Sequence, residues 1–483
     1  MNTASATSPQ PASSRVMLVV LLASNLLASL DQSMMNVALD TVAGAFRIEL
    51  ALANWMVLGF AIVAGATITT AASVLARVGL RRVMVAGYAL SLAGGLLGFF
   101  SWDFPSMLAA RLLQAVTAGL FFPVVSAAIL AIAPKGKSAT LLSLNSAVIG
   151  AGLAFAPLLS GMLITYVSLR AAFLLPAVLA AVLLTVGSRT IHDIEPRAFR
   201  KIDLLSILLS FAGLTLFIYG VNVLGKDLLS ALALMAAGGA VLAAFALWQL
   251  RLKEPLLDLT PLRHATFTIG ELIALLGFMG SLYMSLLVPL YLEGTAGCTP
   301  FVAGCYLVTP IFAYVAATYL GGRIEDARGI WPLVPAGFAL LVAGLIVTGL
   351  AASRLMTIGV LVGAGAAYAG VGLAYAPLKS YDLEAVPARL ISNASAIHST
   401  FSQVVTSFAS ALFVGVMSSD ATRLLAGGAS KADAYAAGFS HTLLIELGIA
   451  ATLLVAAIAF SLFARRRRSA RQNVRKGSAG AAR

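Results

Sequence analysis

Two ionisable side chains lie inside apolar segments that are long enough to cross a bilayer. Asp31 falls within the segment 16–39, and Arg111 falls within the segment 107–133. A charged group in hydrocarbon costs about 3 kcal/mol or more unless it is paired or faces a wet cavity, so both residues mark a candidate functional site. An acid beside an arginine can exchange a proton when the site alternates between water-open and closed states. We therefore predict proton coupling by this pair, with a static ion pair as the alternative.

Polar side chains around Asp31 predict that the first helix faces a central cavity. At about 100° per residue, Gln32 and Asn36 form one polar stripe with Asn25, while Asp31 lies on a different face. Gln114 lies one helical turn from Arg111 and can orient either partner. We expect the face with Asp31 to serve coupling and the stripe to serve packing, with these amides in supporting roles.

Three further ionisable residues occur in later apolar segments. His398 is expected to lie roughly 12 Å from the end of its helix. There it either supports a proton relay or is a hydrogen-bonded core residue. Glu271 and Glu446 lie within about one and a half turns of a helix end. We expect both carboxylates to snorkel to the membrane interface.

The composition indicates which elements must hold these side chains. Hydrophobic residues make up 60% of the 483-residue chain and only 11% are charged, with a mean hydropathy of +0.96. The polar surface that a water-soluble globule needs is missing, so we predict an all-α polytopic membrane protein whose spans are about 17 to 27 residues long. The fourteen spans are expected at 16–39, 53–75, 83–102, 107–133, 139–163, 171–188, 202–224, 229–250, 267–292, 302–320, 332–351, 355–377, 390–416 and 441–464.

The basic residues predict the orientation of these spans. The chain has a net charge of +13 and 32 Lys and Arg residues, most of which lie on the cytoplasmic side if both termini are cytoplasmic. Arg465 to Arg468 then form an anchor at the surface of the inner membrane, and we expect no nucleic-acid partner. The six on the opposite side are Arg47, Arg170, Lys226, Arg354, Arg423 and Lys431.

An internal repeat predicts two similar halves. The loop after the second span carries Arg77 and Gly79, and the loop after the tenth carries Gly322, Asp326 and Gly329 in matching register. Eight helices separate the two loops, which fits two six-helix bundles with two helices inserted between them. The predicted parts are a cytoplasmic tail (1–14), an N-terminal bundle (15–188), a loop (189–201), two inserted helices (202–250), a linker (251–266), a C-terminal bundle (267–464) and a basic tail (465–483).

Together these motifs resemble those of fourteen-span members of the major facilitator superfamily, in the branch of drug:proton antiporters. Arg111-x-x-Gln114 is similar to the RxxQG motif of that family. Ala76 stands where the first loop of the family usually has an acid, which puts the usual charge contacts of that loop in doubt. A run in the fifth span resembles the antiporter motif GxxxGPxxGG and comprises Gly152, Ala156, Pro157, Ser160 and Gly161.

The resemblance implies a secondary antiporter that exports small amphipathic compounds by alternating access. It implies the proton motive force as the energy source, no cofactor and no enzymatic activity. Small residues of the fifth span form a close-packing ridge and Pro157 permits a bend, so this motif is either a gating hinge or ordinary helix packing. Export of an endogenous metabolite, such as a siderophore or an amino acid, and a non-transporting sensor or scaffold are the alternatives. We expect a monomer, with periplasmic adaptor proteins as candidate partners.

Other features of the sequence concern ligands. Cys298 and Cys305 have no neighbouring histidine or further cysteine in the sequence that would complete a metal site, and both are expected to be structural. The stretch 131–138 ends like a phosphate loop but lacks its first glycine and a preceding strand, so we expect no ATP site. Aromatic and polarizable side chains that line a substrate cavity, or alternatively belong to the core or face lipid, are Phe121, Phe122, Phe278, Met279, Tyr283 and Met284.

Overall fold

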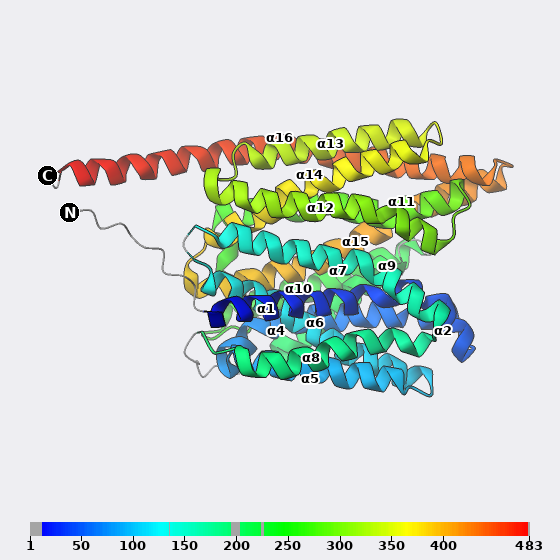
Figure 1. Ribbon diagram of the computed structural model, residues 1–483, viewed down its shortest axis with the longest axis horizontal. Coiled ribbons are helices and arrows are strands. Elements are labelled where there is room, and N and C mark those ends of the chain that lie inside the picture. The colour runs from blue at the N-terminus through cyan, green and yellow to red at the C-terminus, as the bar shows by residue number, and fades with distance from the viewer. Residues whose placement is uncertain (1–11, 135, 195–202, 224–226, 482–483) are drawn as a thin grey trace.

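The computed structural model describes residues 12–134, 136–194, 203–223 and 227–481. Within these ranges the chain forms helices and no strand, and fourteen helices are long and apolar enough to cross a membrane. The predicted all-α fold with fourteen spans is confirmed. Figure 1 shows the long helices running in a common direction, with the first residues of α1 and the last residues of α16 at the same end.

The helices fall into three groups along the chain. The first half comprises α1 (Ala12–Ser33), α4 (Trp55–Val78), α5 (Leu80–Phe99), α6 (Phe104–Ile132), α7 (Ser138–Tyr166) and α8 (Leu174–Thr190). Two helices follow, α9 (Leu204–Val223) and α10 (Leu228–Arg251). The second half comprises α11 (Ala265–Thr295), α12 (Pro300–Arg328), α13 (Leu333–Ala352), α14 (Thr357–Glu384), α15 (Ile391–Ala426) and α16 (Lys431–Ala481). Short elements between them are η1 (Met34–Val37), α2 (Leu39–Phe46), α3 (Leu50–Ala53), η2 (Leu169–Phe173), η3 (Thr260–Arg263) and η4 (Ala388–Leu390).

Short polar side chains fix where several helices begin. The Asp103 carboxylate accepts a hydrogen bond from the main-chain N–H of Ser106 (2.9 Å) at the start of α6, and the Thr299 hydroxyl accepts one from Val302 (3.4 Å) at the start of α12. Such caps satisfy N–H groups that have no partner inside the helix. The bonds from Ser106 hold the pKa of the Asp103 carboxyl below its usual value.

Several helix boundaries differ from those predicted by hydropathy, and two of the differences bear on the candidate site. The first helix ends at Ser33, and the chain continues in the 3₁₀ turn η1 instead of reaching residue 39. Helix α14 continues past Pro377 to Glu384, so Lys379 lies inside a spanning helix. Hydropathy alone predicts a cytoplasmic loop for that lysine, because the residues after Pro377 are polar, whereas the structure buries Lys379, Ser380 and Asp382 within the protein.

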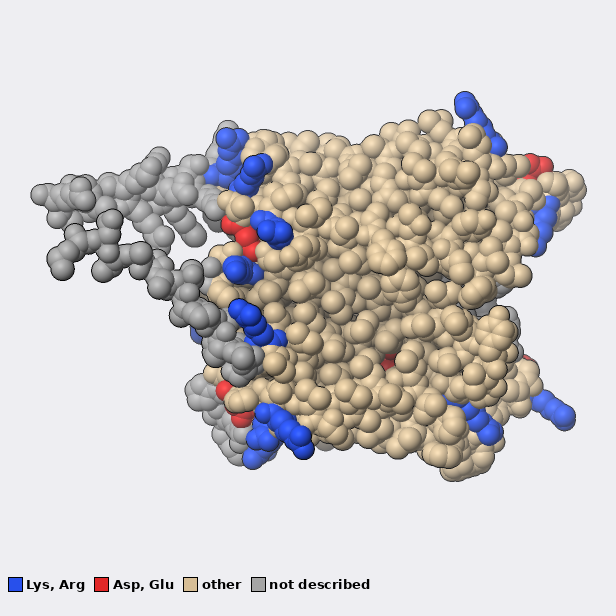
Figure 2. Space-filling model, in the orientation of Figure 1, with Lys and Arg blue, Asp and Glu red and all other residues tan. Residues whose placement is uncertain are grey.

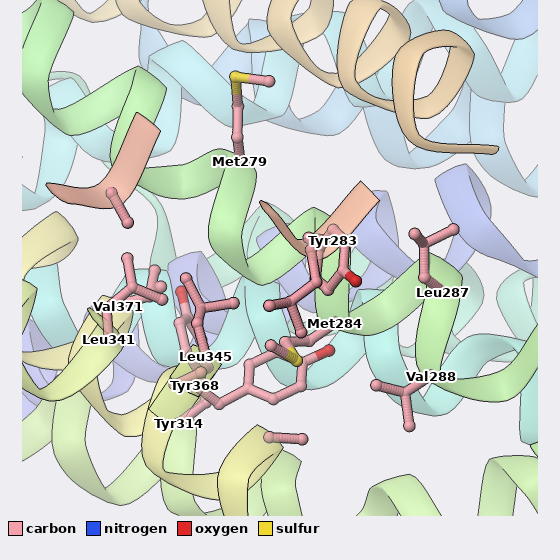
Figure 3. Packing of buried hydrophobic residues seen from close by; sticks show 14 of the residues in the cluster. Met279, Tyr283, Met284, Leu287, Val288, Tyr314, Leu341, Leu345, Tyr368 and Val371 are labelled. Atoms are coloured by element: carbon pink, nitrogen blue, oxygen red, sulfur yellow. The ribbon is translucent and has the colours of Figure 1, made fainter. Parts of the chain in front are cut away.

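The helices pack around apolar cores, one of which lies within the second half and another of which joins residues of both halves, and small residues allow helix backbones to approach closely. In the second half, a Cβ added to Gly370 of α14 would lie 2.4 Å from the main-chain nitrogen of Leu341 in α13, so a larger residue does not fit. Figure 3 shows side chains of this core, including Leu341, Leu345 and Tyr368, packed together. In a bilayer such packing supplies the attraction between helices, since lipid tails are as apolar as the side chains.

The pair α9 and α10 contacts both halves. Leu214 and Ile218 of α9 form one apolar cluster with Leu58 and Ile62 of α4, and Val404 of α15 packs against it. The hydroxyls of Thr69 in α4 and Ser210 in α9 are hydrogen bonded at 2.8 Å. The division of the chain into two bundles and an inserted pair stays a prediction, and these contacts show how the pair is attached.

The two repeated loops have the same backbone but different partners. Gly79 and Gly329 both end a helix with a positive φ, 89° and 82°, which favours glycine. In the second loop the Asp326 carboxylate accepts hydrogen bonds from the main-chain N–H groups of Ala139 (3.1 Å) and Thr140 (2.8 Å) at the start of α7. Asp326 thus caps a helix of the other half, whereas Ala76 in the first loop offers no carboxylate for such a bond.

The charged surface divides the molecule into two ends and an apolar belt. Figure 2 shows Lys and Arg at both ends of a broad belt of other residues, with more of them at the end where α16 terminates. The belt is the surface that meets lipid in a spanning bundle. The assignment of the more basic end to the cytoplasm stays a prediction from the charge rule.

Candidate functional site

The structure brings Asp31 and Arg111 together, through the main chain of Asp31. Both side chains are buried, each with 1% of its surface exposed. Arg111 Nη1 donates to the main-chain oxygen of Asp31 at 2.6 Å and to Oε1 of Gln114 at 3.2 Å. The Asp31 carboxylate instead accepts from the Ser91 hydroxyl through Oδ2 (3.2 Å), while Oδ1 has no partner among the described residues.

Two neighbouring helices, α1 and α4, hold the Arg111 guanidinium of α6 in place. It bonds to α1 through Asp31, it donates from Nε to the main-chain oxygen of Met56 (3.4 Å), and it lies 4.3 Å from the ring centroid of Phe60 in α4. Its Nη2 has no hydrogen-bond partner in the described structure. A buried polar atom without a partner is costly. The site therefore holds one unsatisfied acceptor, Oδ1 of Asp31, and one unsatisfied donor, Nη2 of Arg111.

The polar stripe of α1 makes contacts to both halves. Asn25 Nδ2 donates to Oδ1 of Asn145 in α7 (2.8 Å), and Gln32 Nε2 donates to Oε1 of Gln403 in α15 (3.1 Å). The Gln32 bond joins a helix of the first half to a helix of the second. The prediction for Asn36 falls on a side chain outside the described part of the structure.

His398 is not an isolated histidine. Its Nδ1 lies 2.9 Å and 3.0 Å from the two carboxylate oxygens of Glu271 in α11, and its Nε2 lies 3.0 Å from the hydroxyl of Tyr375 in α14. A hydrogen on Nδ1 and a hydroxyl donating to Nε2 satisfy all three groups. Glu271 is 3% exposed, so the prediction that it snorkels to the interface is wrong, because the helix face that carries it turns toward α14 and α15.

The prediction that Glu446 snorkels to the interface is also wrong. Its side chain is fully buried, and neither carboxylate oxygen has a hydrogen-bond partner in the described structure. It faces α11, where a Cβ added to Gly280 would lie 3.2 Å from Oε1 of Glu446. Distance from a helix end did not predict its position, because the direction of a side chain depends on how the helix is rotated against its neighbours.

A cavity lies between the two halves and encloses about 610 Å³, part of which is open to solvent. Phe122 and Phe278 line it, as predicted. The other four aromatic and sulfur-containing side chains are buried in the apolar cores, which is the alternative stated for them; Figure 3 shows three of them, Met279, Tyr283 and Met284. Beside these two rings, the lining consists of Gln32, Ser146, Ile149, Gly150, Leu153, Tyr314, Tyr375, Lys379, His398, Ser399, Ser402 and Gln403.

Sequence reasoning missed several residues of this cavity and of the Asp31 site. Lys379 was missed because apolar length alone ended its helix early, although the first proline after Pro377 is Pro387 and no glycine stands between them. That absence of a breaker is the signal that could have extended the helix. Ser91 carried no signal, because single polar residues in spans are common.

The small-residue ridge of α7 packs against α1. Gly152, Ala156 and Ser160 are buried, whereas Pro157 and Gly161 are partly exposed. A Cβ added to Gly152 would lie 1.9 Å from the Ser29 hydroxyl oxygen, so this glycine is required for the close approach of the two helices. The close-packing interpretation of the ridge is supported by this geometry, and a gating role stays a prediction.

The described residues contain no group of three or more His, Cys, Asp or Glu side chains placed to hold a metal ion. A family model described as Major Facilitator Superfamily matches residues 21–410, a range that extends from α1 to α15 and includes Asp31, Arg111 and His398. The chain belongs to the Major Facilitator Superfamily. It is therefore a membrane transporter, and the prediction of a multi-pass protein of the plasma membrane is confirmed.

Solved and curated members of this superfamily resemble the chain over most of its length. The structure of the proton:xylose symporter XylE bound to 6-bromo-6-deoxy-D-glucose shares the fold, with a TM-score of 0.57 at 15% identity over 90% of this chain and 94% of that chain. Lincomycin resistance protein LmrB of Listeria monocytogenes is 25% identical over 391 residues, which cover 80% of this chain and 83% of that protein. Riboflavin transporter RibZ of Clostridioides difficile is 22% identical over 335 residues, which cover 68% of this chain and 72% of that protein.

Proposed function

We propose that this transporter is a proton-coupled antiporter that exports small amphipathic compounds, toxic ones among them, from the cytoplasm. The observation that carries the proposal is the Asp31 carboxylate, which is buried beside Arg111 and keeps one oxygen without a partner. Burial costs an ionised carboxylate more free energy than it costs a protonated carboxyl group. Gain or loss of a proton at Asp31 therefore changes the relative stability of closed and water-open states.

Arg111 serves in this mechanism as a fixed positive charge. Its bonds to main-chain oxygens of α1 and α4 do not depend on the charge of Asp31. In one state the ionised carboxylate turns toward the free Nη2 of Arg111, and in the other the protonated carboxyl group remains on Ser91. Each proton that enters past 100 mV releases about 2.3 kcal/mol in addition to the pH difference. This energy drives export without a cofactor.

The choice of exported compound rests on the relatives. LmrB of Listeria monocytogenes is a lincomycin resistance protein, and its similarity to this chain supports export of toxic compounds. The cavity supports small amphipathic ligands, because it combines aromatic rings with polar side chains between the two halves.

The test uses purified protein in proteoliposomes that contain a pH-sensitive dye. Wild-type protein is expected to move protons when lincomycin or another amphipathic drug is added, and Asp31→Asn is expected to lose this flux while remaining folded. The matched control is Asp433→Asn, which removes an exposed carboxylate. Drug-driven proton flux in Asp31→Asn equal to that of wild-type protein would contradict the assignment of Asp31.

A second candidate is export of an endogenous metabolite by the same mechanism. It is favoured by the similarity to the riboflavin transporter RibZ of Clostridioides difficile. A deletion strain separates the two candidates. Lower secretion of one metabolite with unchanged drug susceptibility favours metabolite export. Higher drug susceptibility with unchanged metabolite secretion favours drug export. A non-transporting sensor predicts no ligand-driven proton flux in either setting.

A further inference from the structure

Among the described residues that line the central cavity, Lys379 and His398 carry basic side chains and none carries a carboxylate. It lies on α14 and is 6% exposed. Within the described residues it forms no ion pair closer than 4.0 Å. A buried ammonium group without a counter-ion costs free energy. A ligand that brings a negative charge into the cavity would remove that cost.

The acids near this lysine do not face the cavity. Glu271 lies behind His398, with both of its carboxylate oxygens within 3.0 Å of Nδ1 of that ring, and it is not part of the lining. Asp382 lies one helical turn beyond Lys379 and packs against α11, where a Cβ added to Gly270 would meet its carboxylate. Both acids therefore lie outside the lining, while the cavity itself presents the cation.

The cavity also offers a neutral donor. Gln403 accepts a bond from Gln32 through Oε1, while its Nε2 is buried and has no partner in the described structure. An amide N–H₂ in that state can donate to a ligand oxygen. Lys379 and Gln403 thus give the lining two groups that donate hydrogen bonds to an anion, and bonds to charged acceptors are the stronger kind.

Aromatic rings lie beside these donors. Phe278 and Tyr375 are stacked, with ring centroids 4.8 Å apart, and Phe122 joins them in the lining from the first half. Flat aromatic surface binds flat ligands. We infer that the cavity has a subsite for aromatic organic acids, in which Lys379 and Gln403 hold the ligand anion and these rings hold its apolar body. This inference narrows the ligand class of the proposed exporter and rests on that proposal for the transport step.

Binding to the purified full-length protein tests the subsite. The probes are two matched pairs, 1-naphthoate with 1-naphthamide and anthraquinone-2-carboxylate with its amide, each titrated while the thermal unfolding temperature is recorded. The wild-type protein should bind each acid about tenfold or more tightly than its amide. Lys379→Gln should abolish this preference, and Lys379→Arg should keep part of it, since the charge remains.

A matched control removes a positive charge elsewhere. Lys431→Gln alters an exposed residue at the start of α16 and should leave the preference for the acids unchanged. The inference is overturned if wild-type protein binds the amides as tightly as the acids, or if Lys379→Gln keeps the preference. The first result does not depend on whether any variant folds.

Proton flux in proteoliposomes separates this inference from the proposed function. Acid binding that depends on Lys379 without any ligand-driven proton flux supports the subsite and contradicts the antiporter. Drug-driven proton flux that is unchanged in Lys379→Gln, together with equal binding of acids and amides, supports the antiporter and overturns the subsite.

Discussion

Asp31 and Glu271 are both buried acids, but the structure satisfies them differently. Both oxygens of Glu271 are within hydrogen-bond distance of His398, whereas Asp31 keeps Oδ1 without a partner. A satisfied acid stabilises one packing arrangement, while an unsatisfied one stores free energy that a change of state can release. At the scale of single residues this difference fits the proposed proton exchange at Asp31, and we expect Glu271 to be mainly a packing partner of His398.

This difference leads to a prediction for the pair in the second half. Glu271→Gln should lower the free energy of unfolding by about 3 kcal/mol, because it removes the negative charge of a buried pair and replaces one of the two oxygens that face His398 with an N–H₂ donor. The measurement is reversible unfolding in mixed micelles. Glu49→Gln, which changes an exposed acid, is the control and should leave stability nearly unchanged.

A double-mutant cycle completes that test. If the two side chains interact directly, the losses caused by Glu271→Gln and His398→Gln should not add, and the difference should be about 0.5 to 3 kcal/mol. Additive losses would show that the two residues stabilise the protein independently, against the contact seen here.

At the scale of helices, α7 links elements that are far apart in the chain. Its small-residue ridge contacts α1, and its first turn is capped by Asp326 from the last turn of α12. Gly322, one turn before Asp326, also lies against α7, since a Cβ there would be 2.5 Å from Cβ of Ser143. Movement of one half against the other must therefore change the surroundings of α7.

The ridge provides a matched pair of glycine substitutions. Gly152→Ala should reduce both stability and transport, because the added methyl group has no space beside Ser29. Gly161→Ala adds the same atom to the same helix with nothing within 4 Å and should have little effect. Unfolding temperature and proteoliposome transport are the two measurements. Equal effects of the two variants would show that helix propensity, and not close packing, governs this motif.

The cap from the second half leads to another prediction. Asp326→Ala should destabilise the protein by roughly 1 kcal/mol, the usual cost of a lost helix cap, and should change transport because this cap joins the halves. The measurements are unfolding in mixed micelles and ligand-driven proton flux. Transport equal to that of wild-type protein would mean that the cap does not take part in the conformational cycle.

Asp227→Ala is the control for this variant, since it removes a cap at the start of α10 that does not join the two halves. Hydrogen bonds from Ser230 hold the pKa of Asp227 below its usual value. The stabilisation by that cap is therefore fully present above the ordinary carboxyl pKa and is lost as the pH falls below it. Transport by Asp227→Ala at neutral pH should stay close to that of wild-type protein.

At the scale of the whole molecule, the uneven charge of the two ends predicts orientation. Figure 2 shows more Lys and Arg at the end where α16 terminates, and the positive-inside rule assigns that end to the cytoplasm. A fluorescent protein fused after residue 483 should therefore fluoresce, and alkaline phosphatase fused at the same place should be inactive. A fusion after Lys431, at the opposite end, should give the reverse pattern. Active phosphatase at the C-terminus would refute the orientation.

Sequence alone determined the properties that depend on local composition. Apolar length gave fourteen spans, the repeated glycines of the two loops indicated two related halves, and a charge within a span identified Asp31 and Arg111. These features could be predicted because a bilayer imposes length and polarity on each helix separately.

Only the tertiary structure decided which side chains meet. In the tertiary structure Glu271 contacts His398, more than a hundred residues away in the chain, and Glu446 is buried. Lys379 lines the central cavity, whereas four of the predicted lining residues belong to the cores. Hydropathy fixes how deep a residue lies, but the rotation of each helix about its axis follows from packing against helices distant in the chain. That rotation determines whether a polar side chain faces lipid, a partner or the cavity.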